Sequence, residues 1–522
     1  MTTIWRGPAS LLARYGPLQG RAGRPGPREG SSASRAAFAL ASLALLHAPW
    51  PATAAEPAPS PPASGNTVVA APAGDSTGSS EPGFTTGLWT RSNLLGDMFG
   101  LRTWMARYGL SLGIVEISEA LGNVTGGVER GFEYEGLTTM TLQLDTSKAL
   151  GWEGGTFNAS ALQIHGRNLS AEHLDNLQTA SGIEAARTTR LWELWYQQSF
   201  LEGRFDIKGG QQSIDQEFIS SQYSALFVNT MMGWPMVPSV DLYAGGPAYP
   251  LSSLGIRARG QPGGNVTLLG GVFDDNPPGG PFDDDSQLRG AEASGAKFHL
   301  GTGALFIGEI QYALNQPTLG QMDTGERSAG LPGTYRLGAW FDTARFPDQR
   351  FDNIGLSLAN PKSTGIPAMH SHNFSLYGVA DQTIWQPDPQ SPRALSVFAR
   401  LMGAPGDRNL VDFSVNAGVT LKAPFEGRDN DTVGLGFGLA KVSGRTAALD
   451  RDTAILTGTP VPRRSTEEFI ELTYQFQIAP WWQVQPDFQY VFNPGGGILN
   501  PNTIAVRLHN EAIIGMRTII TF

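Results

Sequence analysis

The sequence predicts an all-β protein, a single transmembrane antiparallel β-barrel of sixteen strands with a short N-terminal periplasmic helix. Three observations predict this fold class. From about Leu110 to the last residue, apolar and polar residues alternate with a period of two, the period of a strand with two different faces. Gly makes up 65 of 522 residues, and charged residues are only 16%, against about 25% in soluble proteins. No stretch reaches the roughly 18 to 20 apolar residues that a membrane-spanning helix needs.

The chain begins with the features of an export signal. Six Arg precede the apolar segment Ala36–Leu46, and Ala52-Thr53-Ala54 then supplies the small residues that signal peptidase prefers. We therefore predict that residues 1–55 are a signal peptide, with a disordered basic arm as the alternative. Its removal leaves a chain more acidic than the overall net charge of −10. This charge argues against nucleic acid as a partner, because phosphate binding needs clustered Lys and Arg.

Two short segments lead from the predicted signal to the barrel. Residues 56–83 are rich in Ala, Pro, Ser and Gly and are too polar to bury a core, so we predict a disordered leader. Residues 84–109 are predicted to be a short periplasmic helical segment that packs at the mouth of the barrel, which would occupy residues 110–522. Its helix is expected around Leu94 to Tyr108, where four apolar residues follow helical spacing: Leu94, Met98, Leu101 and Met105.

The alternating runs supply the strands. The run from Ile470 to Ile478 places its apolar side chains on one face and its polar side chains on the other, and the run from Trp482 to Phe492 repeats the pattern. Runs of about 9 to 11 residues with aromatic side chains near their ends are typical of membrane barrels. We expect strands near residues 110–118, 136–145, 155–165, 190–200, 204–212, 252–260, 264–273, 302–314, 334–342, 372–381, 394–402, 410–422, 431–442, 468–478, 482–492 and 511–522.

An even number of strands lets both ends of the sheet finish on the periplasmic side, with connectors alternating between long outer loops and short inner turns. Two connectors depart from this alternation. Residues 315–333 are long for an inner turn and residues 403–409 are short for an outer loop, so one strand pair could be misplaced, with Phe351–Leu358 as a spare strand candidate. The last run ends at Phe522, and a terminal Phe that closes an alternating strand is common in outer-membrane proteins.

The sequence carries few signals for catalysis or metal binding. His370-Ser371-His372 lacks a third ligand nearby and is interpreted as part of an outer loop. The acidic connector 274–285 offers several carboxylates, and both a calcium site and a solvated loop remain open. No G-x-S-x-G elbow, P-loop or H-E-x-x-H sequence occurs. We expect no enzyme activity, no cofactor and no catalytic or metal centre.

From Trp89 to Phe522 the chain resembles the carbohydrate-selective porin family, OprB type. The resemblance rests on the order and spacing of several short segments, among them Leu94-Leu95-Gly96-Asp97, Leu191-Trp192-Glu193-Leu194-Trp195-Tyr196-Gln197-Gln198, Lys208-Gly209-Gly210-Gln211-Gln212, Gly246-Pro247-Ala248-Tyr249-Pro250 and Gln485-Pro486-Asp487-Phe488-Gln489-Tyr490. It implies a sixteen-stranded barrel in the bacterial outer membrane through which mono- and small oligosaccharides diffuse passively into the periplasm. The implied partners are small neutral sugars, outer-membrane lipids and the barrel-assembly machinery, which would bind Phe522. The alternative is a general diffusion porin or a channel for another small polar solute.

A channel that favours sugars needs planar hydrogen-bonding groups for the hydroxyls and aromatic rings for the C–H faces. Alternation places candidates of both kinds on the inward face. The connector Ser213–Leu251 is rich in aromatic residues, so we expect it to fold into the barrel and narrow it, with Trp234 as the best stacking candidate. The alternative is that inward charges only solvate a water-filled channel. The expected pathway residues are Trp195, Lys208, Asp215, Glu217, Trp234, Arg257, Arg259, Glu309, Arg336, Trp340, Arg400, Glu471 and Arg517.

Overall fold

The computed structural model describes residues 87–280, 282, 292–316, 330–388, 391–458, 460–503 and 505–522. The predicted signal peptide, the predicted leader and the first residues of the predicted periplasmic segment lie outside these ranges, so they stay predictions. Among the described residues, no helix combines the length and the apolar character that a membrane span requires.

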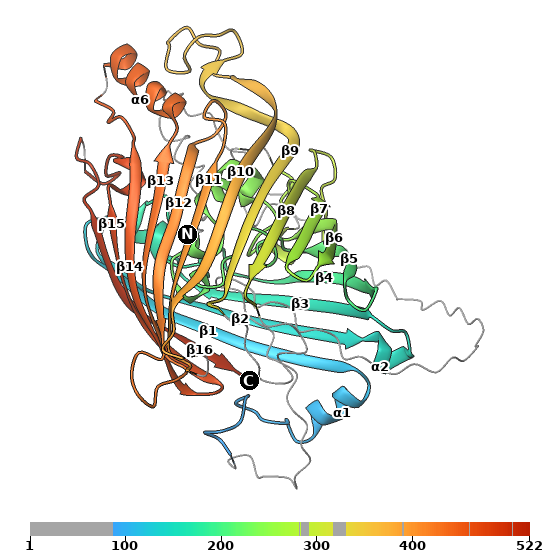
Figure 1. Ribbon diagram of the computed structural model, residues 1–522. Coiled ribbons are helices and arrows are strands. Elements are labelled where there is room, and N and C mark those ends of the chain that lie inside the picture. The colour runs from blue at the N-terminus through green and yellow to red at the C-terminus, as the bar shows by residue number, and fades with distance from the viewer. Residues whose placement is uncertain are drawn as a thin grey trace, which may run out of the picture.

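The described chain forms one closed antiparallel barrel in which each strand pairs with its neighbours in sequence and β1 pairs with β16 (Figure 1). The number and order of the predicted strands are confirmed. The strands are β1 Leu110–Thr125, β2 Gly131–Asp145, β3 Gly155–Gly166, β4 Thr188–Phe200, β5 Phe205–Gln212, β6 Ser253–Gly263, β7 Val266–Phe273, β8 Leu305–Leu314, β9 Gly333–Asp352, β10 Pro367–Trp385, β11 Ala394–Gly403, β12 Val411–Lys422, β13 Thr432–Val442, β14 Thr466–Ala479, β15 Trp482–Phe492 and β16 Glu511–Thr521.

The predicted irregularity in the connectors has a different cause from a misplaced strand pair. Residues 315–332 join β8 to β9 at the lower rim, and these two strands are neighbours in the barrel. The long connector on that side is therefore real, and the suspected misplacement of a strand pair was wrong. β9 and β10 are instead far longer than expected, and in Figure 1 their hairpin extends beyond the neighbouring strands. The spare strand candidate Phe351–Leu358 is not a separate strand, because Phe351 belongs to β9 and only bridges to Ser357.

The outward face is mostly apolar, as the alternation predicts, whereas the inward face carries charged and polar side chains together with apolar side chains that pack inside the barrel. Leu337, Leu376, Leu435 and Leu472 are all exposed on the outside of their strands. We call the end at which β1 begins and β16 ends the lower rim, and the opposite end the upper rim. Exposed aromatic side chains gather toward both rims, as headgroup-level anchors do. Examples near the upper rim are Phe132, Phe306, Phe341 and Phe374, and examples near the lower rim are Phe157, Phe200, Tyr312 and Trp385.

Short helices occupy both rims. α1 spans Leu101–Arg107, a shorter range than expected, and residues 87–100 form turns and bends. The Leu94 backbone N–H donates to the Thr521 carbonyl at 2.8 Å, and Arg102 donates to the carbonyls of Leu112 and Phe522, so this segment lies against the lower ends of β1 and β16. At the lower rim α2 spans Thr146–Leu150, and at the upper rim α6 spans Gly444–Thr457.

Candidate functional site: the lumen and its inner connectors

Two upper connectors occupy the interior of the barrel. Residues 167–187 join β3 to β4 and contain a π-helical turn at Ser170–Leu174, while residues 213–252 join β5 to β6 and contain α3 Thr230–Gly233 and α4 Met236–Asp241. Their apolar side chains and inward side chains of β1 and of β7 to β16 form one buried cluster, in which Phe227 lies 5.6 Å from Phe398, centroid to centroid. The prediction that Ser213–Leu251 packs inside the barrel is confirmed.

Backbone in irregular conformation must find hydrogen-bond partners when it is buried, and here inward carboxylates supply them. The N–H groups of Val228 and Asn229 donate to Glu471 at 2.5 and 3.2 Å. The Ile219 N–H donates to Glu309 at 2.9 Å. These contacts join the connector to walls formed by β14 and β8, so the connector crosses the lumen.

Arg400 on β11 supplies the opposite kind of anchor. Its guanidinium donates to the carbonyls of Met231, Met232 and Gly233 at 2.6, 2.7 and 2.9 Å, and to that of Ile219 at 3.3 Å. The residue is fully buried. The carbonyls at the end of α3 would otherwise lack partners, so Arg400 replaces the hydrogen bonds that a longer helix would form.

We expect Arg400→Met to destabilise the protein by about 3 kcal/mol, because buried carbonyls lose a charged donor. The measurement is the thermal unfolding temperature in detergent, together with protease cleavage within residues 213–252. Arg259→Met is the matched control, because that guanidinium is partly exposed and should leave the unfolding temperature nearly unchanged. Equal losses of stability in both variants would contradict the anchoring role of Arg400.

The structure divides eleven of the thirteen predicted pathway residues into two groups, and Asp215 and Arg336 lie outside both. The first group is buried against the connectors and has little exposed surface, and direct sugar contact by its members stays a prediction. Trp234 is 8% exposed and its indole N–H donates to the Gly245 carbonyl at 2.9 Å, so it packs within the connector instead of presenting an open ring. The group comprises Trp234, Glu309, Trp340, Arg400, Glu471 and Arg517, the last of which pairs with the buried Glu119.

The second group forms a charged cluster with Asp206, which is not one of the predicted pathway residues, on β4, β5, β6 and the connector 213–252. We define the charged cluster as Trp195, Asp206, Lys208, Glu217, Arg257 and Arg259. The Arg257 Nε lies 2.6 Å from the Glu217 carboxylate, and the Arg259 Nε lies 2.6 Å from the Asp206 carboxylate. Lys208 pairs with Glu217 and lies 5.0 Å from the centre of the Trp195 ring. The side chains of Arg259 and Glu217 are 24% and 23% exposed, so protein covers them only in part.

Glu217 enters this cluster from the connector, whose base is held by Asp215. The Asp215 carboxylate accepts from the Ser213 hydroxyl at 2.5 Å and from the Tyr249 N–H at 3.1 Å, which joins the two ends of the connector. Burial raises the pKa of Glu217, but Lys208 and Arg257 outweigh it and lower the pKa to about 2. Glu217 is therefore ionised throughout the ordinary pH range.

A depressed carboxylate pKa means that the ion pair persists above the usual value and is lost only as the pH falls through about 2. We expect the ratio of anion to cation permeability, obtained from reversal potentials in a KCl gradient, to show no transition from Glu217 between about pH 8 and pH 4. Glu217→Gln at neutral pH should raise anion permeability, because Lys208 and Arg257 lose a partner. A Glu217-dependent transition near the ordinary carboxyl pKa would contradict this pairing.

A second polar group lies on β8, β9 and β10. The Arg336 guanidinium pairs with Asp381 at 2.8 Å and lies 4.0 Å from Glu309, which also accepts from the Tyr377 hydroxyl at 2.9 Å. Asp381 in turn accepts from the Gln222 N–H at 3.0 Å. Arg336 therefore contacts both the wall and the groups that position the connector.

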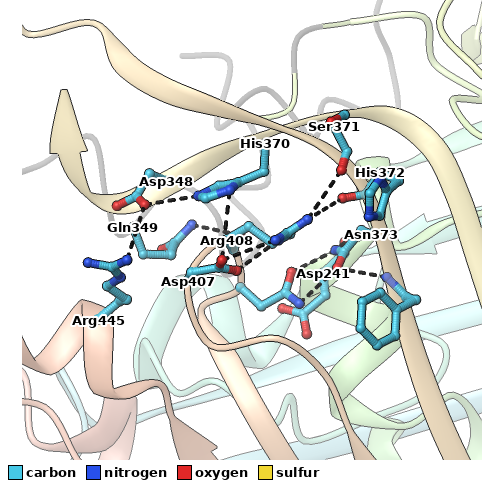
Figure 2. A network of polar contacts seen from close by, with 12 residues as sticks. Asp241, Asp348, Gln349, His370, Ser371, His372, Asn373, Asp407, Arg408 and Arg445 are labelled. Carbon is cyan, nitrogen blue, oxygen red and sulfur yellow. Dashed lines mark hydrogen bonds and ion pairs between the residues drawn. The ribbon is translucent and has the colours of Figure 1, made fainter. Parts of the chain in front are cut away.

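Figure 2 shows how the long β9–β10 hairpin is held at the upper rim. His370 Nε2 lies 2.9 Å from the Asp348 carboxylate and His370 Nδ1 lies 3.7 Å from Asp407. Arg408 donates to Asp407 at 2.8 Å and to the His372 carbonyl at 2.7 Å. The hairpin is thereby joined to the β11–β12 connector.

The weak metal signals of the sequence acquire separate explanations. The His372 ring stacks on Phe341 with centroids 5.3 Å apart, whereas His370 pairs with carboxylates, so the two imidazoles have different partners. Within the described ranges, no three or more His, Cys, Asp or Glu side chains are arranged to hold a metal ion. In the acidic connector, Asp274 and Asp275 are buried and burial raises the pKa of Asp274 to about 6. Residues 283–285 lie outside the described ranges, so calcium binding there stays a prediction.

With the geometry established, comparison with known proteins decides the family. The family model "Carbohydrate-selective porin, OprB family" matches residues 129–522. The chain belongs to the carbohydrate-selective porin family, OprB type. Porin B of Pseudomonas aeruginosa is 28% identical over 427 residues, which cover 77% of this chain and 87% of that protein. The high-pH structure of Pseudomonas putida OprB shares the fold, with a TM-score of 0.71, 24% identity and coverage of 83% of this chain and 99% of that chain.

As a member of the OprB family, the protein is an outer-membrane carbohydrate channel of Gram-negative bacteria. The barrel fold and the family point to a channel rather than an enzyme. Sequence reasoning missed three residues that this OprB-family porin uses in its polar groups. Asp206 and Asp381 lie at inward positions of alternating runs and pair with Arg259 and Arg336, and Gln197 accepts from Arg257 at 3.0 Å. Alternation could have found all three, because it assigns the inward face without regard to residue type.

Proposed function

We propose that this porin admits neutral mono- and small oligosaccharides by passive diffusion into the periplasm, through a constriction lined by the charged cluster. The observation that carries the proposal is the position of the Trp195 ring beside Lys208, with Arg259 and Glu217 partly exposed in the same cluster. A sugar ring can lie with its C–H face on an indole while its hydroxyls exchange hydrogen bonds with charged planar groups.

The ion pairs of the cluster support weak binding. Arg259 is already held by Asp206, and Glu217 by Lys208 and Arg257, so their geometry is set before a solute arrives. Because each group remains partly satisfied by its protein partner, a sugar replaces water without leaving a charge unpaired. A conducting site must bind weakly enough to release its solute. Arg336 with Asp381 extends the polar wall along β9 and β10.

The alternative is a general diffusion porin or a channel for another small polar solute. The charge around the cluster does not favour an anionic solute, because Glu193, which accepts from the Trp195 indole at 3.3 Å, adds a third carboxylate to Asp206 and Glu217 against Lys208, Arg257 and Arg259. Liposome swelling with neutral sugars and with sugar acids of equal size separates these possibilities. Faster entry of the sugar acid would favour the alternative.

The direct test is planar-bilayer conductance titrated with glucose and with longer glucose oligomers. We expect the ionic current to be blocked with a dissociation constant near 1 mM, about 4 kcal/mol, because a transport site must both bind and release. Current that falls only as far as the viscosity of the sugar solution requires would contradict selective binding.

Assembly through the barrel-assembly machinery is proposed to use Phe522, whose N–H donates to the Ile114 carbonyl at 2.9 Å.

A further inference from the structure

One face of α1 presents apolar side chains to its surroundings at the lower rim. Leu101, Trp104 and Tyr108 follow helical spacing and are 40%, 53% and 56% exposed. The rings of Trp104 and Tyr108 lie 5.3 Å apart, centroid to centroid. We call these three residues the apolar face of α1. Apolar side chains that are exposed together mark a contact surface, so the question is what covers this face.

The segment that leads into α1 follows the wall of the barrel. The indole N–H of Trp481, in the β14–β15 turn, donates to the Leu88 carbonyl at 2.6 Å. The chain then contacts the lower ends of β16 and β1, and the Asp145 N–H at the end of β2 donates to the Gly109 carbonyl at 2.8 Å. These contacts run along consecutive strands, so α1 lies at the rim beside α2 and not within the lumen (Figure 1).

The apolar outer wall continues down to the start of α1. Met140 and Leu142 are exposed on the outer face of β2, which identifies the outward positions of this strand pair. The last outward pairs before the lower rim are Ile114–Met140, Leu112–Leu142 and Leu110–Leu144. Every member of these pairs is apolar, and Leu110 follows Tyr108 after a single residue. The surface that lipid covers on β1 and β2 is therefore continuous with the apolar face of α1.

α2 is joined to the aromatic belt of the same wall. The Trp152 ring, just after α2, lies 6.2 Å from the Tyr196 ring, which lies 4.5 Å from the Phe157 ring on β3. Trp152 and Phe157 are 59% and 47% exposed. Aromatic side chains of this kind lie at the level of the lipid headgroups. α2, and α1 beside it, are therefore at the depth of the membrane surface.

Two cationic side chains border the apolar face. Arg107 lies in the last turn of α1 and Lys148 lies in α2, and both are exposed. A Cβ on Gly109 would lie 2.9 Å from the Lys148 Cβ, so the two helices bring these cations to the same part of the rim. Lys and Arg beside an apolar surface can keep their stems on that surface while the charge reaches a lipid phosphate.

We infer that α1 and α2 bind phospholipids of the periplasmic leaflet of the outer membrane. The lower rim carries very short connectors such as residues 264–265, so it faces the periplasm. Trp104 and Tyr108 lie between the upper parts of the acyl chains, and Arg107 and Lys148 bind the phosphates, as in a helix that lies in the plane of a membrane surface. The lipid-binding surface thus extends from the strands to the segment that precedes them.

The test of the apolar face uses the absence of cysteine from the chain. Trp104→Cys and Ala106→Cys each receive a nitrobenzoxadiazole probe, and the folded proteins are placed in nanodiscs that contain a phospholipid with a nitroxide near the top of its acyl chain. Ala106→Cys is the matched control, because Ala106 is also exposed but lies about 200° further round the helix. Quenching should be several-fold stronger at position 104. Equal quenching, or an unquenched probe at position 104, would overturn the inference, and the second result would mean that protein covers this face.

A second experiment tests the cations. In the labelled Trp104→Cys protein, nitroxide-labelled phosphatidylglycerol should quench at least twofold more strongly than phosphatidylcholine with the same label, because Arg107 and Lys148 favour the anionic lipid. Adding Arg107→Gln and Lys148→Gln should make the two lipids equal, while heat-modifiable migration in gels shows that the barrel is folded. No preference with both cations present, or an undiminished preference without them, would overturn their assignment to lipid phosphates.

Discussion

Deletion of residues 225–240 should raise single-channel conductance several-fold and abolish block by sugars. The deleted segment contains α3, most of α4 and Phe227, whose ring fills the interior against β11 and β13. The sixteen-strand ladder does not depend on it, because every strand pairs with its sequence neighbours and β1 pairs with β16. Arg400 and Glu471 lose their backbone partners, but water enters the widened lumen and solvates them. The measurement is conductance in a planar bilayer with and without glucose oligomers.

The control for this deletion is a variant of the same connector that keeps its length. Trp234→Phe retains most of the packing and removes only the N–H that donates to Gly245. We expect its conductance and sugar block to remain near those of the native channel. If the deletion left conductance unchanged in a folded barrel, residues 225–240 would not narrow the pathway.

Trp195→Ala should weaken sugar block about tenfold, about 1.4 kcal/mol, because the stacking face for the sugar ring is lost. The ring also lies beside Lys208, so the variant frees that ammonium group toward Glu217 without removing any charge. The ionic conductance should therefore change much less than the sugar affinity. The measurement is the concentration of glucose oligomer that halves the current.

Trp340→Phe is the matched control for Trp195→Ala. Both tryptophans lie on the inward face, but Trp340 is fully buried behind the connector, whereas Trp195 is partly exposed. Sugar block should be unchanged in Trp340→Phe. A loss of affinity in Trp340→Phe equal to that in Trp195→Ala would mean that inward position alone, and not exposure, determines sugar contact.

Sequence reasoning reached the barrel wall more completely than the site. Alternation assigned Trp195, Lys208, Arg257 and Arg259 to the inward face, and the structure brings these four together with Glu217. The same rule also assigned Trp340 and Arg400 to the pathway, although both are covered by the connector. Alternation reports which side of the sheet a residue occupies, and it contains no information on what covers that side.

The lengths of β9 and β10 were underestimated for a similar reason. β9 and β10 are longer than the membrane is thick. The apolar and polar alternation that identifies a strand in lipid therefore ends before the strands do, while their hydrogen-bonded pairing continues toward the upper rim. Their upper part is held by contacts such as His370 with Asp348 and Arg408 with the His372 carbonyl. Such contacts join residues from different connectors, and no local pattern predicts them.

By itself the sequence determined the strand number, the strand order and the face on which each wall residue lies. These properties follow from a period of two within runs of about ten residues and from pairing between neighbouring runs. Only the tertiary structure decided which inward residues border water and which hold the connectors. That division depends on contacts between distant residues, such as Arg400 with Met231 and Gln489 with Ala180, which are 169 and 309 positions apart. The packing of a connector across a lumen is a property of the closed barrel, because the walls it contacts meet only when the sheet closes.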